Sequence, residues 1–278
     1  MKRNIVIVGL GLIGGSLARA FRKYTDFDIA GIDRDPAVLQ AALDCGAIRK
    51  AGLEEDIGRA DILFLCLYPQ ACLDFVAEHL GSIRPGCLVT DTCGVKSYLC
   101  PRLAQAAAEH GFFFVGGHPM AGREQRGFGA GDAELFAGAS YLVVPCGAPP
   151  EAVGLLKSTV SPLGIARTVE TTPEEHDRMI AFTSQLPHVL ACAYVMSPQC
   201  PSHAGFSAGS YRDVSRVANI NETMWSELFL ENREALVGEL DTLVSHIGEI
   251  RDAVDAGDRP ALQELLRKGR RIKEGLGE

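Results

Sequence analysis

Residues 5–8 and the glycines that follow them constrain the fold of this chain most strongly. The apolar run Ile-Val-Ile-Val predicts a buried strand, and it leads into Gly9, Gly11 and Gly14 with the spacing G-x-G-x-x-G. Helix-compatible residues 16–21 come next, so the pattern indicates a strand, a glycine-rich turn and a helix. Such a turn lets the backbone approach a pyrophosphate, which binds at the N-terminus of the helix. The segment therefore predicts a dinucleotide site.

An acidic residue at the expected distance supports this prediction. Asp33 ends the second predicted strand, about 20 residues after the glycines. Its carboxylate would accept hydrogen bonds from ribose hydroxyls and repel a 2′-phosphate, which favours NAD over NADP, although the neighbouring Arg34 works against that preference. We also expect cofactor contacts from Leu12 and Ile13 in the turn. The alternative is a glycine-rich turn in some other α/β protein.

The turn after the third predicted strand should face the same crevice. Residues 67–69 read Leu-Tyr-Pro, and parallel strands present their carboxyl ends at one edge of the sheet. Leu67 and Pro69 are therefore further candidates for cofactor contact, with a simple connecting loop as the alternative.

The first half of the chain alternates short apolar runs with helical stretches, which predicts a parallel sheet with helices on both faces. The expected strands are residues 5–8, 29–33, 62–67, 88–91, 112–115, 141–144 and 167–170. After residue 172 only helical runs remain, with Pro187 as the expected position of a kink. We therefore expect a Rossmann-type, doubly wound, mostly parallel sheet in residues 1–172 and an all-helical domain in residues 173–278. Long amphipathic helices of this kind favour a homodimer.

Charge and cysteine usage exclude several classes of protein. The 27 Lys+Arg against 35 Asp+Glu give a net charge of −8, which argues against a general nucleic-acid or membrane-surface binder. No apolar run has the length of a signal peptide or a membrane span, so we expect a cytoplasmic protein. The nine cysteines are scattered, without C-x-x-C pairs or zinc spacing, which predicts reduced core thiols and no metal site.

Two clusters carry residues suited to chemistry. His118 lies among glycines just beyond the predicted strand 112–115, and imidazole titrates near neutrality, so it is a candidate base for the proton lost as hydride leaves. Arg212 and Arg216 lie one helical turn apart, where their guanidinium groups can bind carboxylates and Asp213 can orient one of them. The alternatives are an ordinary loop histidine and a solvated charged helix.

Five motifs together resemble the prephenate dehydrogenase family, which also includes arogenate and cyclohexadienyl dehydrogenases. They are GLGLIGGSLA at 9–18, HPMAGRE at 118–124, SQLPH at 184–188, YRDVSR at 211–216 and MWSELFLEN at 224–232. The resemblance implies NAD-dependent oxidative decarboxylation of prephenate to 4-hydroxyphenylpyruvate in tyrosine biosynthesis. It also implies a Rossmann domain followed by a helical dimerisation domain, with active sites between them.

The resemblance assigns roles to individual residues. His118 matches the catalytic histidine, which accepts the proton of the ring 4-hydroxyl. Arg216 matches the arginine that binds a substrate carboxylate, with Arg212 as the next candidate, and His188 matches a second histidine that contacts the substrate. Glu124 matches an acid at the entrance of the pocket.

Two further positions match the family. Asp213 corresponds to a second acid at the pocket entrance, which holds basic groups there. His176 corresponds to a position near the site, although the residues around it indicate only an ordinary first-turn helix residue.

The chain departs from the family pattern after the fourth predicted strand. The family usually has Asp-x-Gly-Ser-Val-Lys there, and its serine hydrogen-bonds the catalytic histidine. This chain has DTCGVK at 91–96, so Gly94 stands at the serine position. We expect either that Thr92, a backbone group or water holds His118 instead, or that the proton is handled slightly differently. Lys96 is expected either near the site or, as the residues around it favour, at the surface at a helix start, and Cys93 is not expected to act as a nucleophile.

Three other functions compete with this prediction. Arogenate or dual-specificity cyclohexadienyl dehydrogenases share the motifs. A β-hydroxyacid or 6-phosphogluconate type dehydrogenase shares the layout, but it should carry a catalytic lysine on a helix of the second domain, where segment 183–190 has His188 and no lysine. A nicotinamide-sensing regulator without turnover would leave His118, Arg216 and Glu124 unexplained.

Overall fold

The computed structural model describes residues 3–277 of the chain. These residues form two compact units, which divide between Asn232 and Arg233. The first unit contains both sheets and all predicted site residues, and the second is a pair of helices.

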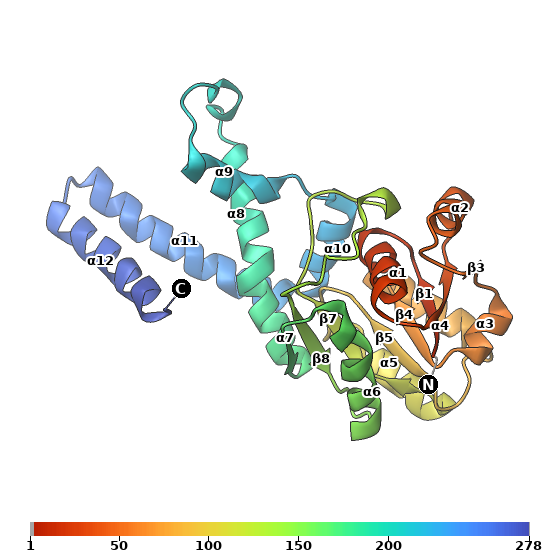
Figure 1. Ribbon diagram of the computed structural model, residues 1–278. Coiled ribbons are helices and arrows are strands. Elements are labelled where there is room, and N and C mark those ends of the chain that lie inside the picture. Colours follow the sequence, from red (N-terminus) through yellow and green to blue (C-terminus); the bar gives the residue numbers. More distant parts are fainter. Residues whose placement is uncertain (1–2, 278) are drawn as a thin grey trace. The chain divides into compact units, whose positions relative to one another are not determined.

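A parallel six-stranded sheet forms the centre of the first unit (Figure 1). Its strand order is β3-β2-β1-β4-β5-β6, so the direction of winding reverses between β1 and β4. The expected strands 5–8, 29–33, 62–67, 88–91 and 112–115 all occur, with ends shifted by at most a few residues, whereas the short strand β3 was not expected. The strands are β1 (Asn4–Val8), β2 (Asp28–Ile32), β3 (Lys50–Ala51), β4 (Ile62–Leu65), β5 (Leu88–Asp91) and β6 (Phe113–Phe114).

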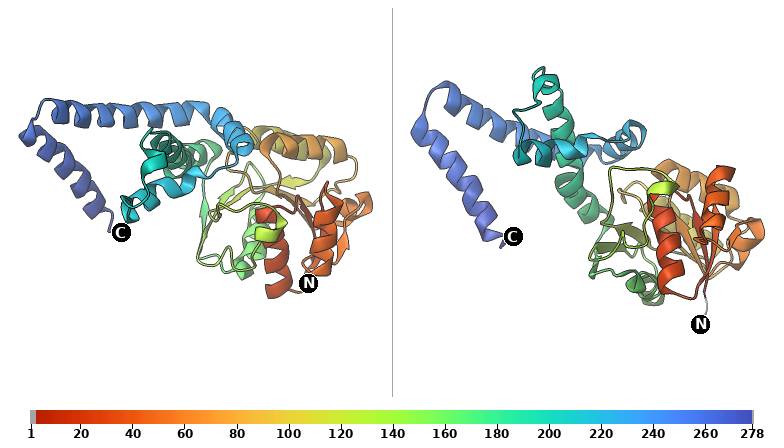
Figure 2. Two further views of the ribbon diagram at one scale, coloured as in Figure 1. Left: turned by 90° about the horizontal axis from the view of Figure 1, so that it is seen from above. Right: turned by 45° about the horizontal axis from the view of Figure 1, so that its top comes forward.

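Helices cover both faces of this sheet, as the alternating pattern predicts. Figure 2, left, shows α1 and α2 on one side of the strands and α4 and α5 on the other. In α2 the Asp35 carboxylate accepts a hydrogen bond from the Ala37 N–H at 2.9 Å, which caps the helix start just before Pro36. The helices are α1 (Leu12–Tyr24), α2 (Pro36–Asp44), α3 (Glu54–Arg59), α4 (Pro69–His79), α5 (Cys100–His110) and α6 (Pro150–Val160).

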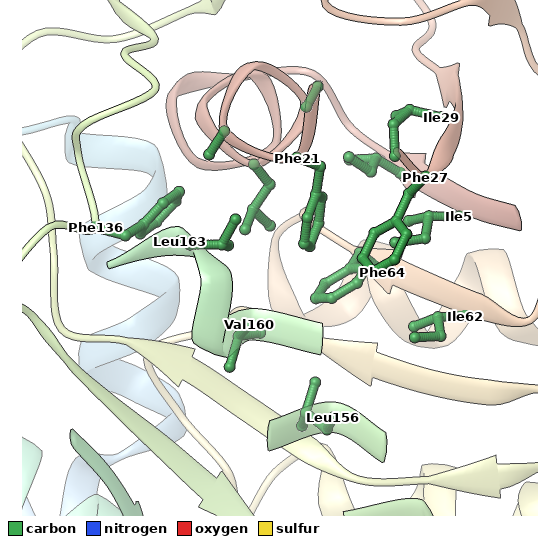
Figure 3. Close-up of a cluster of buried hydrophobic side chains, with 14 of the residues drawn as sticks. Ile5, Phe21, Phe27, Ile29, Ile62, Phe64, Phe136, Leu156, Val160 and Leu163 are labelled. Carbon is green, nitrogen blue, oxygen red and sulfur yellow. The ribbon is translucent and has the colours of Figure 1, made fainter. Parts of the chain in front are cut away.

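Two apolar cores result, one on each face of the sheet. On the first face Phe21 of α1 packs against Phe64 of β4, with ring centroids 5.5 Å apart, and α6 contributes Leu156 and Val160 (Figure 3). On the second face, Cys72 of α4 and Leu103 of α5 pack against the sheet. These cores hold the carboxyl ends of the central strands in place.

A second, three-stranded sheet corrects the prediction of a single sheet. Its strands are β7 (Gly116–Pro119), β8 (Ser140–Val144) and β9 (Arg167–Glu170), with β7 antiparallel to β8. His118 therefore lies on a strand and not in a loop. The backbone of β7 approaches β5 closely: the Gly117 N–H donates to Asp91 Oδ1 at 3.2 Å, and a Cβ at Gly117 would lie 2.5 Å from Tyr141 Oη. Only glycine permits this approach.

Helices complete the first unit after Thr172, which caps the first of them by accepting a hydrogen bond from the Glu175 N–H. A π-helical turn, η3 (Ala181–Gln185), precedes Pro187 at the place where a kink was expected. Pro187 has no backbone N–H, so it cannot donate the hydrogen bond that a regular α-helix would require at this position. The remaining elements are α7 (Pro173–Ile180), α8 (Leu186–Val195), η4 (Cys200–Ser202), α9 (Gly209–Ser215), η5 (Arg216–Ala218) and α10 (Glu222–Glu231).

The second unit is a helical hairpin of α11 (Arg233–Asp255) and α12 (Arg259–Gly275). Asp258 begins α12, and its carboxylate accepts the Ala261 N–H at 3.0 Å. Apolar side chains on both helices are exposed, among them Val244, Val254, Leu266 and Ile272. No helix within residues 3–277 combines the length and apolar character needed to cross a membrane.

Candidate active site

A cavity of about 770 Å³ opens in the first unit beyond the carboxyl ends of β1, β4 and β5. This is the edge at which parallel sheets bind ligands, beside the reversal of strand order. The lining comes from the glycine-rich turn (11–13), the turns after β4 (66–69) and β5 (92–94), β7 with its following loop (118–127), and helical residues of 180–188, 216–221 and 224–228.

The glycine-rich turn has the shape that a dinucleotide requires. Gly9 has φ +85°, and a Cβ at Gly14 would lie 1.9 Å from the Gly9 carbonyl oxygen, so neither position accepts a side chain. Gly11 lines the cavity, and a Cβ built there would meet no atom within 4 Å. The open space beside this backbone, together with the N-terminus of α1, fits a bound pyrophosphate. Leu12 and Ile13 line the same wall.

The other expected cofactor residues lie around this turn. Asp33 lies outside the cavity lining at the end of β2, where its Oδ2 accepts the Leu10 N–H at 2.8 Å and thereby fixes the turn. Leu67 and Pro69 line the cavity. Between them, the Tyr68 hydroxyl accepts a hydrogen bond from Asn221 Nδ2 at 2.9 Å, which ties the sheet to the segment before α10.

His118 belongs to a hydrogen-bonded chain that the sequence does not reveal. Its Nδ1 lies 3.0 Å from Nε2 of His176, and Nδ1 of His176 lies 2.7 Å from Asp177 Oδ1. The Asp177 carboxylate also accepts the backbone N–H groups of Lys96 and Ser97, at 2.8 and 2.7 Å. His176 is therefore a buried link between His118 and an anchored carboxylate. It lies beside His118, as its family position implies, and the indication of an ordinary first-turn helix residue is wrong.

This chain determines the tautomers of both histidines. The pKa of Asp177 is held below its ordinary value because the His176 and Ser97 donors outweigh the effect of burial, so its carboxylate is an acceptor only. His176 then carries its proton on Nδ1, and its Nε2 accepts the Nδ1 proton of His118. Nε2 of His118 is left as an unprotonated acceptor. Burial, with smaller contributions from His176 and Lys96, also lowers the pKa of His118 well below its ordinary value.

Lys96 is fully buried, so its expected surface position is wrong. Its Nζ donates to Asp91 Oδ2 at 2.6 Å and to the Cys93 carbonyl at 2.7 Å. Burial alone would lower the pKa of Lys96, but the Asp91 carboxylate outweighs it and holds that pKa above its ordinary value. Asp91 in turn accepts the Gly117 N–H of β7. Through this contact of Asp91 with Gly117, the ion pair fixes the β7 backbone next to His118.

Gly94 lines the cavity and leaves room for a larger residue. A Cβ there would lie 3.6 Å from both methyl groups of Leu228, an ordinary contact. Thr92, one of the replacements offered for the family serine, donates to the Leu65 carbonyl instead, at 3.5 Å. The partner that the structure supplies for His118 is His176.

The cysteines around the site are thiols. All nine are free, and the Sγ atoms of Cys72 and Cys93 lie 3.7 Å apart. The neighbouring Cys72 and burial raise the pKa of the Cys93 thiol, which is therefore protonated at neutral pH. Within the part of the chain that is described, no group of three or more His, Cys, Asp or Glu side chains is arranged to hold a metal ion.

Arg216 and Glu124 both line the cavity and form an ion pair with each other. The backbone N–H of Glu124 and the Arg216 guanidinium hold the pKa of the Glu124 carboxyl below its ordinary value. His188 lines the cavity nearby. Its Nδ1 donates to the Ser184 carbonyl at 2.8 Å, and its ring stacks on Trp225 with centroids 3.8 Å apart. Nε2 of His188 is consequently free to accept a hydrogen bond.

Two predicted residues are not brought to this site. Arg212 and Asp213 lie on α9 with exposed side chains, and neither lines the cavity. Conversely, the cavity contains Arg123 and Arg126, which the sequence did not single out. The only sequence feature that could have indicated them is the presence of charged residues directly after HPMAG.

The fold and the cavity define a class of protein: a nucleotide-binding α/β domain whose ligand crevice is closed by helices. Residues 17–169 match the model of the prephenate dehydrogenase nucleotide-binding domain, and residues 172–268 match that of the prephenate dehydrogenase dimerization domain. The chain belongs to the prephenate dehydrogenase family, which confirms the resemblance seen in the five motifs. It is an oxidoreductase of the prephenate/arogenate type in tyrosine biosynthesis.

Individual relatives span nearly the whole chain. The prephenate dehydrogenase of Bacillus subtilis is 31% identical over 99% of this chain and 76% of its own length, and the cyclohexadienyl dehydrogenase of Zymomonas mobilis is 30% identical over 99% and 96%. Among solved structures, Synechocystis arogenate dehydrogenase has a TM-score of 0.82 at 27% identity, covering 99% of this chain and 100% of that one. A prephenate dehydrogenase from A. aeolicus, in complex with hydroxyphenyl propionate and NAD+, has a TM-score of 0.87 at 25% identity, covering 99% of each.

The competing β-hydroxyacid dehydrogenase layout is also recognisable. Mycobacterium tuberculosis 3-hydroxyisobutyrate dehydrogenase has a TM-score of 0.63 over 92% of this chain and 95% of its own, but only 14% identity. That likeness concerns the fold alone.

Proposed function

We propose that this protein catalyses the NAD-dependent oxidative decarboxylation of prephenate to 4-hydroxyphenylpyruvate. The observation that carries the proposal is the His118–His176–Asp177 chain, which leaves Nε2 of His118 as an unprotonated acceptor. His118 shares its cavity with the glycine-rich turn and with Arg216. A base, a dinucleotide site and a carboxylate-binding cation are the three elements that this reaction needs.

The chain's residues divide the chemistry between them. The glycine-rich turn would hold NAD, which would supply the acceptor for the hydride that leaves C4 of the ring. His118 Nε2 accepts the proton of the 4-hydroxyl, while Arg216 holds a carboxylate and exchanges part of its contact with Glu124 for it. The ring carboxylate then leaves as carbon dioxide, and the electron pair of the broken C–C bond completes the aromatic ring and places a negative charge on the C4 oxygen. That phenolate oxygen takes back the proton held by His118. General-base catalysis of this kind contributes roughly 10²–10⁴-fold.

The charges that line the cavity favour prephenate over arogenate. Arg216 is the lining cation that we assign to a substrate carboxylate, and the single lining carboxylate, Glu124, already pairs with it. Prephenate carries two carboxylates and no cation, whereas arogenate adds an ammonium group that needs an acceptor. No second carboxylate among the described lining residues provides one.

NAD is the proposed cofactor because Asp33 directly follows β2, where a 2′-phosphate would meet its carboxylate. We further propose that the protein is a homodimer, since residues 172–268 match the family's dimerization domain and α11 and α12 expose apolar side chains.

Paired initial-rate assays test the proposal. NADH or NADPH formation is followed by absorbance with prephenate or arogenate, each with NAD and with NADP. We expect the highest kcat/KM with prephenate and NAD. Comparable rates with arogenate would establish a dual-specificity dehydrogenase, as in the relative named cyclohexadienyl dehydrogenase. Binding of NADH without turnover of either substrate would refute the proposal and favour a nicotinamide-sensing regulator.

A further inference from the structure

Arg126 is a cavity cation without a partner. It lies in the loop between β7 and the short helix η1 (Phe128–Ala130), and it lines the cavity together with the glycine-rich turn. Within residues 3–277 its guanidinium makes no hydrogen bond or ion pair. The two other lining arginines differ: Arg123 pairs with Asp132 at 2.6 Å, and Arg216 pairs with Glu124.

The residues that follow Arg126 anchor the loop to α1. Phe128 packs so closely on Gly15 that a Cβ there would lie 2.8 Å from the Phe128 ring. The Arg19 guanidinium stacks over the same ring, 4.3 Å from its centroid, and the Asp132 N–H donates to Ser16 Oγ at 3.0 Å. These contacts fix the chain just after Arg126 against the second turn of α1.

The start of α1 has a charge deficit that Arg126 can fill. Residues 9–18 contain no lysine or arginine, so the backbone N–H groups and the helix dipole, about half a unit charge, are the local positive groups. The diphosphate of a dinucleotide carries two negative charges. A planar guanidinium binds phosphate oxygens through paired hydrogen bonds, and it loses no internal partner when it does so.

We propose that Arg126 binds the diphosphate of the dinucleotide, so that one loop serves both ligands: Glu124 reaches Arg216 on the substrate side, and Arg126 reaches the cofactor. This inference rests on the dinucleotide part of the proposed function. It assigns a cofactor-binding role to a loop that the glycine motif does not include.

The test is the dissociation constant of NADH, measured by fluorescence or calorimetry for the wild type and for Arg126→Gln. We expect about 10-fold weaker binding or more, which is the effect of losing hydrogen bonds to a charged group. ADP-ribose, which has the diphosphate but no nicotinamide, should lose affinity by the same factor. Arg126→Lys should recover part of the loss, and Arg126→Gln should show a smaller dependence of the dissociation constant on salt.

Arg59→Gln is the matched control. It removes one positive charge from an exposed position at the end of α3, outside the cavity lining, and should leave NADH affinity within about twofold. An Arg126→Gln protein with unchanged NADH and ADP-ribose affinity overturns the inference. If its KM for prephenate rises instead, Arg126 is a substrate residue. If the wild type binds NADH but turns over neither prephenate nor arogenate, the proposed function fails while the Arg126 result still stands.

Discussion

Nδ1 of His118 lies 3.0 Å from Nε2 of His176, and this contact decides which nitrogen of His118 can take up a proton. His176 is itself held by Asp177, whose carboxylate is anchored to the backbone at the start of the segment before α5. Two residues of α7, His176 and Asp177, therefore orient His118 through its Nδ1, and no hydroxyl at position 94 is involved.

Replacing the base should remove turnover but not cofactor binding. We expect His118→Asn to fold, to bind NADH with wild-type affinity and to lose at least about 10²-fold in kcat with prephenate. Steady-state kinetics and NADH titration measure the two effects separately. Near-normal turnover would show that another group accepts the proton.

The positioning role of His176 predicts a graded series. His176→Leu removes the acceptor for the His118 Nδ1 proton, and we expect kcat to fall on the order of 10²-fold because the tautomer is no longer fixed. His176→Gln keeps an oxygen acceptor and should retain more activity than the leucine variant. Equal losses in both variants, with parallel losses of thermal stability, would point to a packing role only.

The lowered pKa of His118 sets the pH dependence of catalysis. The base acts when it is neutral, so kcat/KM should be constant through neutral pH and fall as the pH drops through a pKa below the ordinary histidine value of 6.5. A pH series of kcat/KM with prephenate measures this limb. An acidic limb centred above 6.5 would contradict the assignment of a desolvated, neutral histidine.

Arg216 should affect the substrate and not the cofactor. Arg216→Ala is expected to raise the KM for prephenate by about 10-fold or more, the scale of a lost charge-assisted contact, with NADH affinity unchanged. Arg212→Ala is the internal control, because Arg212 is exposed on α9 outside the cavity lining. If Arg212→Ala raises the KM for prephenate and Arg216→Ala does not, Arg212 and not Arg216 binds the substrate carboxylate.

Gly94→Ser tests whether the missing family hydroxyl matters. The added side chain meets Leu228 only at an ordinary distance, so the variant should fold normally. Because His176 already holds His118, we expect kcat to change by less than about threefold. If kcat, measured at saturating prephenate and NAD, instead rises by an order of magnitude, then the serine hydroxyl supplies an orientation of His118 that His176 does not provide.

Local patterns in the sequence predicted much of the fold. The strand, the glycine turn and α1 are contiguous in the chain, and each residue type there has a direct conformational reason. The ion pair of Glu124 with Arg216 joins the HPMAGRE and YRDVSR motifs, although no spacing rule relates them.

What the sequence did not reveal depends on contacts between distant segments. The sequence favours a surface position for Lys96 because it does not show that Lys96 pairs with Asp91. That pair is buried in the fold, where the β7 backbone also contacts Asp91. His176 meets His118 from a helix 58 positions away. The strand β7 itself was hidden because its first two residues are glycines, which are poor strand formers unless another backbone approaches closely.

The π-helical turn at 181–185 has a consequence for the two histidines on either side of it. On a regular α-helix, 12 residues of separation would turn His188 about 120° away from His176. The π-turn absorbs one extra residue, which reduces the difference to about 20°. A single widened turn therefore places both histidines on nearly the same face of the helix, and straightening the helix would move one of them to another face.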